Sequence, residues 1–505
     1  MSLSGEIAEA PGSRRFSRRR ASPTSLRWAL ALVIPVGFLL TVGRIESSAV
    51  DYALLTLVSE AALCLLLSGL GRLRLALALP VWLLLSIFLI SYYLKFYLIL
   101  ASPPTPSSEP GFFSSTAISD SVALATYECI ITGFLAFVGV SLVSLAVIAR
   151  NGSRTKSFSE LRQRMGLITF RVALWCSVLL SSTVLAITYK YQLVMGLSVN
   201  WPYHLYDLFT LLSGSLLPSL FLLLLECALR LNARGAAKRV VAAVYLYAIL
   251  NMVLTSSKGP VLTMTVALGV WWIARGGEIR IKQLALGVAA VSLTALLFLP
   301  FEAYRALLVT DFLEHGSVSY ARVLQAGLPE ADSAASGQSG GLSLLERLPG
   351  ADMLVSFIDN NIRPAGLSGL YEAITQHRSV NWYLQRKVFG DFAHFGDTFS
   401  TPAPSWLGFC YAFGGFVGVF VGTAAAVLFV AGVWVLLLRL QPVSLPVLQA
   451  SFLLTWALPV FEEGTPGYSR FGWLFVAVAI EWLSRVSRSS TLLAHRSIAE
   501  HEDRD

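Results

Sequence analysis

The chain has 505 residues, of which 55% are hydrophobic and only 13% are charged, and its mean hydropathy is +0.66. Soluble domains carry about 25% charged residues, so this composition excludes an ordinary soluble protein and indicates one that is solvated largely by lipid. The net charge of +8 does not indicate a nucleic-acid partner, because the cations stand at the ends of apolar runs, as membrane topology requires. The five cysteines lie in apolar stretches without a CxxC pair, so we expect neither a metal site nor a disulfide framework.

Apolar runs long enough to cross a bilayer as helices recur along the chain. We predict an all-α polytopic integral membrane protein with about twelve transmembrane helices. Residues 1–25 form a disordered basic tail, 26–301 contain spans one to nine, 302–405 form one large loop with short helices, 406–485 contain spans ten to twelve, and 486–505 form a second tail. After a first span that begins at Leu26, the spans are expected at about 50–70, 76–100, 118–149, 168–195, 203–229, 240–255, 260–274, 283–301, 406–438, 443–461 and 470–485. Between the seventh and eighth of these twelve, Lys258-Gly259-Pro260 is either a tight turn or a break within one helix.

Charge asymmetry predicts which side of the membrane the long loop occupies. Alternate connections and both termini hold about 26 of the 38 basic residues, and cations favour the cytoplasmic side. The loop from Glu302 to Ser405 has the reverse balance, with about 11 acidic and 7 basic residues. We therefore expect cytoplasmic termini and a periplasmic or extracellular loop, in the cytoplasmic (inner) membrane.

The loop itself has a varied composition. Gln325–Gly341 is rich in Gly, Ala and Ser and is expected to be mobile. Leu342–Ile358 and Ala365–Ile374 carry apolar residues at helical spacing, interrupted by Pro349-Gly350 and by Pro364. This pattern indicates short amphipathic helices that lie on the outer face of the membrane.

Several cations are predicted to face outward, against the general trend. Arginine can grip a phosphate or diphosphate with two hydrogen bonds, which is one reason to place it there. The other interpretation is a snorkelling side chain or a surface salt bridge, and this simpler interpretation is favoured for Lys95 and Lys190. The remaining candidates for phosphate binding are Lys258, Arg305, Arg363 and Arg470.

Acidic and imidazole groups in the loop are candidates for acid–base chemistry. The best histidine is His394, which stands among aromatic residues in DFAHFGDTFS just before the chain re-enters the membrane, and a packed structural imidazole is the alternative. Glu302 and Asp397 are the carboxylates that lie closest to the two ends of the loop.

Three glutamates lie inside predicted spans, where charged groups are costly and often functional. Glu226 is close to the inner end of its span and can snorkel. Glu60 and Glu128 either form a proton path or bond to neighbouring helices. These two residues are the basis for a transporter as an alternative.

The pattern resembles the O-antigen or oligosaccharide repeat-unit polymerases (the Wzy-like family). Three stretches carry the resemblance: TSSKGPVLTM at the turn that opens a span, PFEAYRALL at the start of the long loop, and DTFSTPAPSWLGFCYAFGGFVGVFVG at its exit. The resemblance implies a GT-C-like membrane fold and a metal-independent glycosyltransferase without a cofactor. It also draws attention to Tyr304, in FEAYR, and to Tyr468, in GYSRFG, as residues that contact the substrate.

This resemblance implies an undecaprenyl-diphosphate-linked oligosaccharide as donor and a second lipid-linked repeat unit as acceptor. The diphosphate leaves as the glycosidic bond forms, and outward-facing cations stabilise its developing charge. A chain-length regulator and a flippase are the implied protein partners. An O-antigen ligase or another lipid-linked-sugar glycosyltransferase is the nearest alternative, and a polysaccharide or lipid transporter (flippase) is the alternative of a different class.

Overall fold

The structure is a computed structural model of the whole chain. It describes residues 24–45, 48–101, 118–152, 167–191, 209, 211–231, 233–255, 259–276, 304, 307–308, 311, 315, 319–320, 322–323, 350–376, 383–384, 405–440, 442, 444–463, 472–475 and 477–482. Every regular element within these residues is a helix. Eight of these helices are long and apolar enough to cross a membrane, and three shorter apolar helices accompany them. The chain is therefore a multi-pass membrane protein. The predicted span at 283–301 lies outside the described residues.

The N-terminal helices form one group. Its members are α1 (Thr24–Ala31), α2 (Val33–Thr41), α3 (Ala49–Leu70), α4 (Leu75–Ile87), the π-helix η3 (Phe88–Leu94), α5 (Lys95–Ala101) and α6 (Asp120–Gly152). The segments α4, η3 and α5 run on as one helix from Leu75 to Ala101. The predicted spans 50–70, 76–100 and 118–149 agree with these helices to within about three residues.

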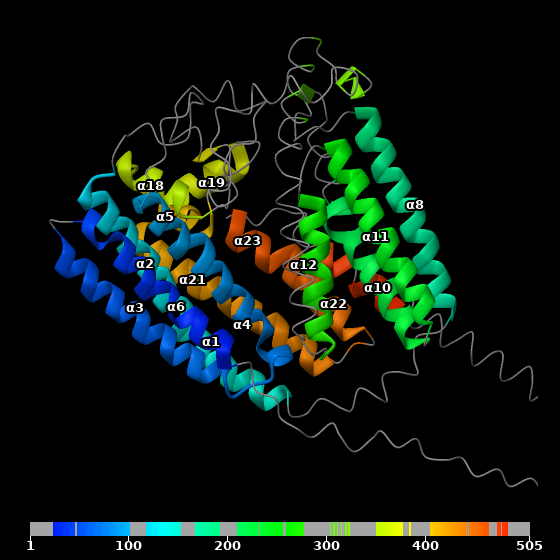
Figure 1. Cartoon of the computed structure of the whole chain (residues 1–505), viewed down its shortest axis with the longest axis horizontal. Coiled ribbons are helices and arrows are strands. Elements are labelled where there is room, and N and C mark those ends of the chain that lie inside the picture. The colour runs from blue at the N-terminus through cyan, green and yellow to red at the C-terminus, as the bar shows by residue number, and fades with distance from the viewer. Residues whose placement is uncertain are drawn as a thin grey trace, which may run out of the picture.

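The second group lies on the other side of the molecule (Figure 1). It contains α8 (Leu167–Tyr191), the π-helix η5 (Leu212–Leu216), α10 (Leu217–Arg230), α11 (Arg234–Thr255) and α12 (Gly259–Ala274). The hydroxyls of Tyr245 in α11 and Thr265 in α12 are 3.3 Å apart. Tyr245 stands ten residues before the end of α11, and Thr265 stands six residues after the start of α12. The two helices therefore lie side by side, so α11 and α12 are two helices joined after Thr255, and the alternative of one helix with a break is wrong.

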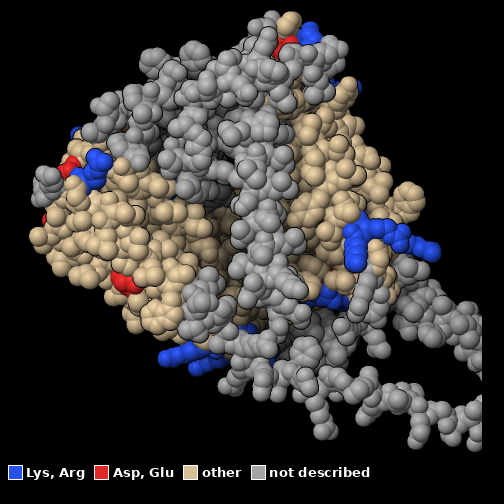
Figure 2. Space-filling view, in the orientation of Figure 1, with Lys and Arg blue, Asp and Glu red and all other residues tan. Residues whose placement is uncertain are grey.

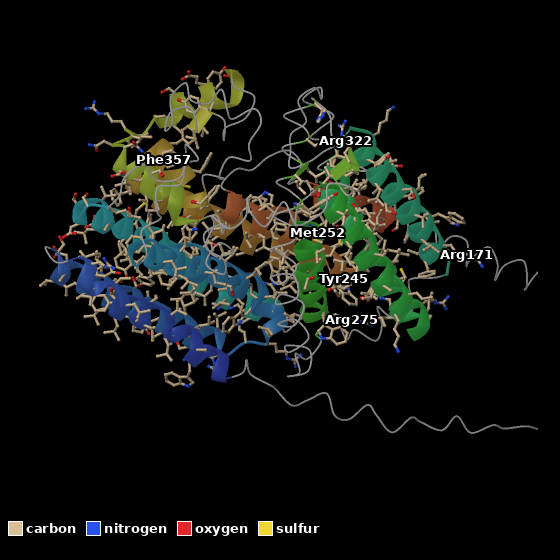
Figure 3. All side chains as sticks on the ribbon, turned by 45° about the horizontal axis from the view of Figure 1, so that its top comes forward. Arg171, Tyr245, Met252, Arg275, Arg322 and Phe357 are labelled. Carbon is tan, nitrogen blue, oxygen red and sulfur yellow. The ribbon has the colours of Figure 1, made fainter. Side chains whose placement is uncertain are left out.

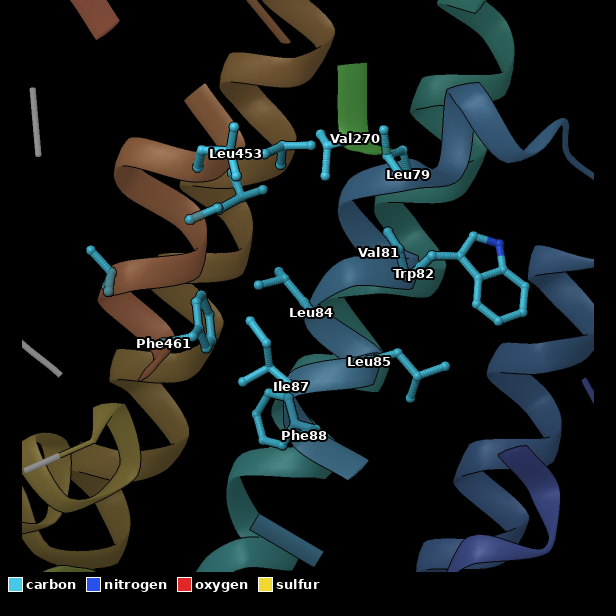
Figure 4. Packing of buried hydrophobic residues seen from close by; sticks show 14 of the residues in the cluster. Leu79, Val81, Trp82, Leu84, Leu85, Ile87, Phe88, Val270, Leu453 and Phe461 are labelled. Carbon is cyan, nitrogen blue, oxygen red and sulfur yellow. The ribbon is translucent and has the colours of Figure 1, made fainter. Parts of the chain in front are cut away.

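The C-terminal helices connect the two groups. They are α21 (Trp406–Leu440), α22 (Leu445–Phe452), the π-helix η7 (Leu453–Ala457) and α23 (Leu458–Glu463). α21 packs against α6, while α22 packs against α10 and α12. Leu79 of α4, Val270 of α12 and Leu453 of η7 meet in the apolar core between the groups (Figure 4).

Charged side chains separate towards the two ends of the bundle (Figure 2). We call the end that carries α18 (Ala351–Asp359) and α19 (Gly366–Gln376) the loop-side end. Arg322 lies at this end, whereas Arg171 and Arg275 lie at the opposite one (Figure 3). In the described part of the chain, the loop-side end holds Asp51, Asp120, Asp311, Asp359 and Glu372 with Arg44, Lys190, Arg322 and Arg363, and the opposite end holds Arg27, Arg72, Arg74, Arg150, Arg171, Arg230, Lys238, Arg239, Arg275 and Arg439 with Glu226 and Glu481.

Glu226 is fixed inside the bundle and does not snorkel. It is 2% exposed, and its Oε1 atom accepts a hydrogen bond from Nε of Arg230 at 2.7 Å. Its Oε2 atom lies 3.7 Å from Nε of Arg275, which follows α12. The glutamate is therefore an ionic link between α10 and the end of α12.

Candidate functional site

The π-helix η3 brings the polar loop and the membrane helices together. A π-helix has a wider turn than an α-helix, because its hydrogen bonds join residues five apart, and such turns occur frequently at functional sites. The carbonyl of Ser91 in η3 is in direct contact with Gly350, the residue before α18, and a Cβ atom at Gly350 would overlap this carbonyl. The first residue of α18, Ala351, is fully buried. Glycine at position 350 thus lets the loop backbone dock on the middle of a membrane helix.

Lys95 lies one turn beyond Ser91 on the same helix and is only 3% exposed. The interpretation of Lys95 as a snorkelling side chain is therefore wrong. Two features hide it from water, namely the packing of α5 against α2 and the packing of α18 against α5. The structure thus places the Lys95 ammonium inside the loop-side half of the bundle, whereas the position of Lys95 near the end of its span predicted an exposed side chain. Lys190, in contrast, is exposed at the end of α8.

Tyr92 connects three segments that are far apart in the sequence. Its hydroxyl donates a hydrogen bond to the carbonyl of Phe461 in α23 at 2.9 Å. The same oxygen accepts hydrogen bonds from the amides of Trp406, at 3.1 Å, and Leu407, at 3.3 Å. These amides open α21 and have no acceptor within their own helix. The tyrosine thus caps the start of α21 and attaches it to α23.

The start of α21 folds back on the rest of that helix. Gly415 has φ 59° and ψ −149°, which is not a helical conformation. A Cβ atom on Gly418 would lie 2.5 Å from the carbonyl oxygen of Cys410, and one on Gly422 would lie 3.9 Å from the ring of Trp406. Residues 8 and 16 positions apart in a straight helix are separated by about 12 and 24 Å. Residues 406–414 are therefore a short re-entrant helix that runs beside the first turns of the true span.

The re-entrant helix begins deep within the membrane-spanning bundle. Gly133, in the middle of α6, faces both Leu407 and Val419. A Cβ atom on Gly133 would lie 2.6 Å from the Leu407 side chain and 3.2 Å from the Val419 side chain. Ser405, the residue before the helix, is fully buried. The prediction of one span at 406–438 is thus wrong for its first nine residues, because the chain from the loop reaches the interior of the bundle before it turns at Gly415.

Both predicted loop helices are present, and they pack in different ways. α18 is not simply laid on the membrane surface, because Leu354, Val355 and Phe357 are buried and the helix packs against α6, α21 and α5. Phe357 contacts Gly408 of the re-entrant helix. α19 is more exposed, and among the described elements its extensive contacts are with α21.

η3, α18 and the re-entrant helix pack together, and we call this unit the loop-side assembly. A network of buried hydroxyl groups lies beside it. Three members stand on one face of α3, at the helical spacing i, i+4 and i+7, and the others come from α2, η3, α5 and α6. The network is held by short hydrogen bonds between Thr41 and Tyr52 (2.9 Å), Thr56 and Tyr127 (3.0 Å), Tyr97 and Tyr127 (3.1 Å), and Tyr93 and Ser59 (3.1 Å).

Glu60 follows Ser59 on α3 and lies at the edge of this network that is farther from the loop-side end. Its Oε1 atom accepts a hydrogen bond from the thiol of Cys64 at 3.4 Å, and its Oε2 atom has no hydrogen-bond partner within the described chain. The buried side chains that follow on α3 are all apolar, and they include Leu63 and Leu66. The polar network on α3 thus stops near the middle of the helix. Glu128 is exposed on α6, and no hydrogen bond joins it to Glu60 among the described residues.

A second loop cluster stands above α8 and α11. Tyr304 packs with Leu308, Val323 and Tyr320. The hydroxyl of Tyr320 donates to the carbonyl of Leu254 in α11 at 3.0 Å, and its ring stacks on Tyr189 of α8. Burial raises the pKa of Tyr320 to about 12. The cluster fastens the start of the long loop to the second helix group.

Asp311 holds this segment together by charge. Its carboxylate accepts a hydrogen bond from the amide of Ser319 at 2.6 Å and pairs with Arg322 at 3.0 Å, and His315 lies 3.2 Å away. Burial alone would raise the pKa of Asp311, but the Ser319 amide and the Arg322 guanidinium together lower it below its ordinary value. The carboxylate is therefore ionised, and its role in the described structure is to fold the segment.

Two of the predicted site residues are described, and the structure does not bring them together. Arg363 is exposed on the link between α18 and α19, whose Pro364 touches the turn at Gly415. Tyr304 belongs to the cluster over α8 and α11, on the other helix group. The remaining candidates lie outside the described residues: Lys258, Glu302, Arg305, His394, Asp397, Tyr468 and Arg470.

Sequence reasoning missed the residues that build the loop-side assembly. Tyr92 and Phe461 are ordinary members of apolar stretches, Ser405 is the last residue of the predicted loop, and the Gly414-Gly415 pair is the sequence signal for the turn. No group of three or more His, Cys, Asp or Glu side chains able to hold a metal occurs in the described part of the chain. No protein-family model, curated protein sequence or solved structure matches this chain.

Proposed function

We propose that this protein is a membrane glycosyltransferase that joins polyprenyl-diphosphate-linked oligosaccharide units. One observation carries the proposal: the polar loop packs into the membrane helices. α18 contacts η3, and the first amide of the re-entrant helix, that of Trp406, donates to the hydroxyl of the buried residue Tyr92. A lipid-linked sugar has an apolar chain in the bilayer and a polar head at its surface. A site made jointly from loop and bundle suits both parts of such a substrate.

The orientation in this proposal follows the charge distribution. Ten described cations gather at the end opposite the loop, which the positive-inside rule assigns to the cytoplasm. The loop then faces the periplasm or the outside, in the inner membrane, and both termini are cytoplasmic. Nucleotide-sugar chemistry in the cytoplasm is not required, because the lipid diphosphate already activates the donor sugar.

In the proposed reaction, a hydroxyl of the acceptor unit attacks the anomeric carbon of the donor. The bond from that carbon to the diphosphate oxygen breaks, and the polyprenyl diphosphate leaves with the bonding electrons. Arg363, which has no ion-pair partner within the described chain, is the best described candidate to bind the diphosphate. His394 or one of the carboxylates Glu302 and Asp397 would accept the hydroxyl proton, and Lys258, Arg305, Arg470 and Tyr468 would contact diphosphate or glycan. Tyr304 has no part in this site, because it packs in the cluster over α8 and α11, away from Arg363.

Purified protein, mixed with lipid-linked oligosaccharide from the cells that make it, tests the proposal. We expect a ladder of longer glycans and release of polyprenyl diphosphate. Arg363→Ala should slow both, whereas Arg44→Ala, another exposed arginine at the loop-side end, should not. A ligase would form no ladder and would transfer glycan only to a different lipid acceptor.

The re-entrant helix also supports a transporter as the alternative function, because interrupted helices occur at the substrate sites of many transporters. In that case the lipid-linked oligosaccharide would cross the bilayer of reconstituted vesicles without any new glycosidic bond. Glu60→Gln would then impair transport, and Arg363→Ala would be tolerated.

A further inference from the structure

One face of α19 is occupied by protein. Leu370 and Ala373 point inward and belong to the apolar cluster that also contains Tyr411 and Phe413 of α21. At the start of α19, the amide of Ala365 donates to the carbonyl of Ala412 at 2.8 Å. The helix is thus fixed on the top of the re-entrant hairpin, next to the turn at Gly415.

The exposed surface of α19 has an apolar side and a polar side. Leu367 is 84% exposed and Tyr371 is 69% exposed. At about 100° per residue, these two side chains lie only about 40° apart around the helix axis, whereas Ser368, Glu372 and Thr375 gather within about 60° on the adjoining part of the exposed surface. A helix that faced water alone would have no reason to segregate its exposed residues in this way.

The apolar side continues a surface that already faces lipid. Pro364, three residues before Leu367, touches Gly415, and the span that follows the turn exposes Phe416, Val417 and Phe420. These three side chains belong to a helix long and apolar enough to cross a membrane. The exposed apolar ridge of α19 therefore begins within one helical turn of the contact between Pro364 and Gly415, and the exposed apolar residues of α21 begin directly after that glycine.

We propose that α19 is an interfacial anchor whose Leu367 and Tyr371 insert into the loop-side leaflet of the bilayer. Leucine contributes apolar area, and tyrosine suits the boundary where its ring meets acyl chains and its hydroxyl meets headgroups. Ser368, Glu372 and Thr375 then face water. The anchor does not depend on the proposed glycosyl transfer, but it places Arg363 at headgroup depth, where a lipid phosphate is found.

A fluorescent probe on single cysteines tests the anchor in the full-length protein. Cys64 and Cys176, the two exposed cysteines, are first replaced by alanine. An environment-sensitive dye is then attached to Leu367→Cys, Tyr371→Cys or, as the matched control, Ser368→Cys, and each protein is reconstituted into phosphatidylethanolamine–phosphatidylglycerol vesicles. Dyes at 367 and 371 should shift to the blue and lose most of their emission to lipids brominated in the acyl chains. The dye at 368 should instead be quenched by aqueous iodide.

Two results would overturn the anchor. Quenching by iodide at all three positions would mean that α19 lies in water. Protection of positions 367 and 371 from both quenchers would mean that protein covers the ridge, either a second copy or another segment of this chain. Leu367→Asp gives an independent measurement. It should shift the emission maximum of the dye at position 371 to longer wavelength, while the thermal unfolding temperature of the detergent-solubilised protein stays the same.

Discussion

The hydroxyl oxygen of Tyr92 lies 3.1 Å from the amide nitrogen of Trp406, 314 residues further along the chain. This contact joins the first membrane-embedded π-helix to the point where the polar loop re-enters the bundle. The same hydroxyl donates to Phe461, so one side chain holds the three segments that surround the loop-side assembly. An apolar bundle offers these groups no water as a substitute.

Tyr92→Phe should therefore destabilise the protein by about 1–3 kcal/mol, because two amides and one carbonyl are left without their partner in a buried place. Thermal unfolding in detergent measures the loss. Tyr93→Phe is the matched control, since the Tyr93 hydroxyl makes a single bond, to the Ser59 side chain at 3.1 Å. An equal loss in both variants would contradict the role of Tyr92 as the common attachment point.

The turn at Gly415 gives a second prediction. Its φ of 59° and ψ of −149° lie in a region that is almost restricted to glycine, and Pro364 stands 3.3 Å from the position of a Cβ atom. Gly415→Ala should cost about 1–3 kcal/mol in strain and open the re-entrant hairpin. Gly414→Ala is the control, because nothing lies within 4 Å of its Cβ position. If the two variants unfold at the same temperature, the turn is not where the structure places it.

The helix positions could be predicted from the sequence far better than the assembly could. Spans such as α3 and α6 are apolar runs bounded by charges, and α18 and α19 are amphipathic segments bounded by Pro349-Gly350 and Pro364. Hydropathy fixes the spans, because a helix satisfies every backbone polar group within its own segment of membrane, and the helical spacing of apolar residues fixes α18 and α19.

The reversal at Gly415 could not be predicted in this way. Residues 406–440 are uniformly apolar and suit a straight helix as well as a hairpin. Gly415 permits the turn, but a glycine pair also suits close packing of straight helices, and the cap from Tyr92 that holds the hairpin is a tertiary contact which no local pattern encodes. The burial of Lys95 has the same origin, since it depends on where α18 docks. Of the predicted site residues, Arg363 and Tyr304 are described, and they stand on different helix groups.

Acid should loosen the segment around Asp311. The pKa of this carboxyl is lowered in the folded protein, so its ionised form stabilises the fold at neutral pH, and this stabilisation is lost as the pH falls through the lowered value. Asp311→Asn should therefore reduce stability at pH 7 and have little effect well below pH 3.8, the ordinary value for the group. Unfolding curves of the wild type and the variant at both pH values make the comparison. A difference that persists unchanged in acid would show that the charge of Asp311 is not what holds the segment.

The orientation of the bundle can be tested at the two ends of the N-terminal helices. Arg44 and Arg72 are both exposed and flank α3, Arg44 at the loop-side end and Arg72 at the opposite one. With Cys64 and Cys176 replaced by alanine, we expect a membrane-impermeant maleimide to label Arg44→Cys from outside intact spheroplasts. Arg72→Cys should be labelled only after the membrane is permeabilised, because the positive-inside rule predicts a cytoplasmic location for the end that carries ten described cations. The reverse labelling would place the long loop inside the cell and would remove the physical basis for lipid-linked glycan assembly on the outer face.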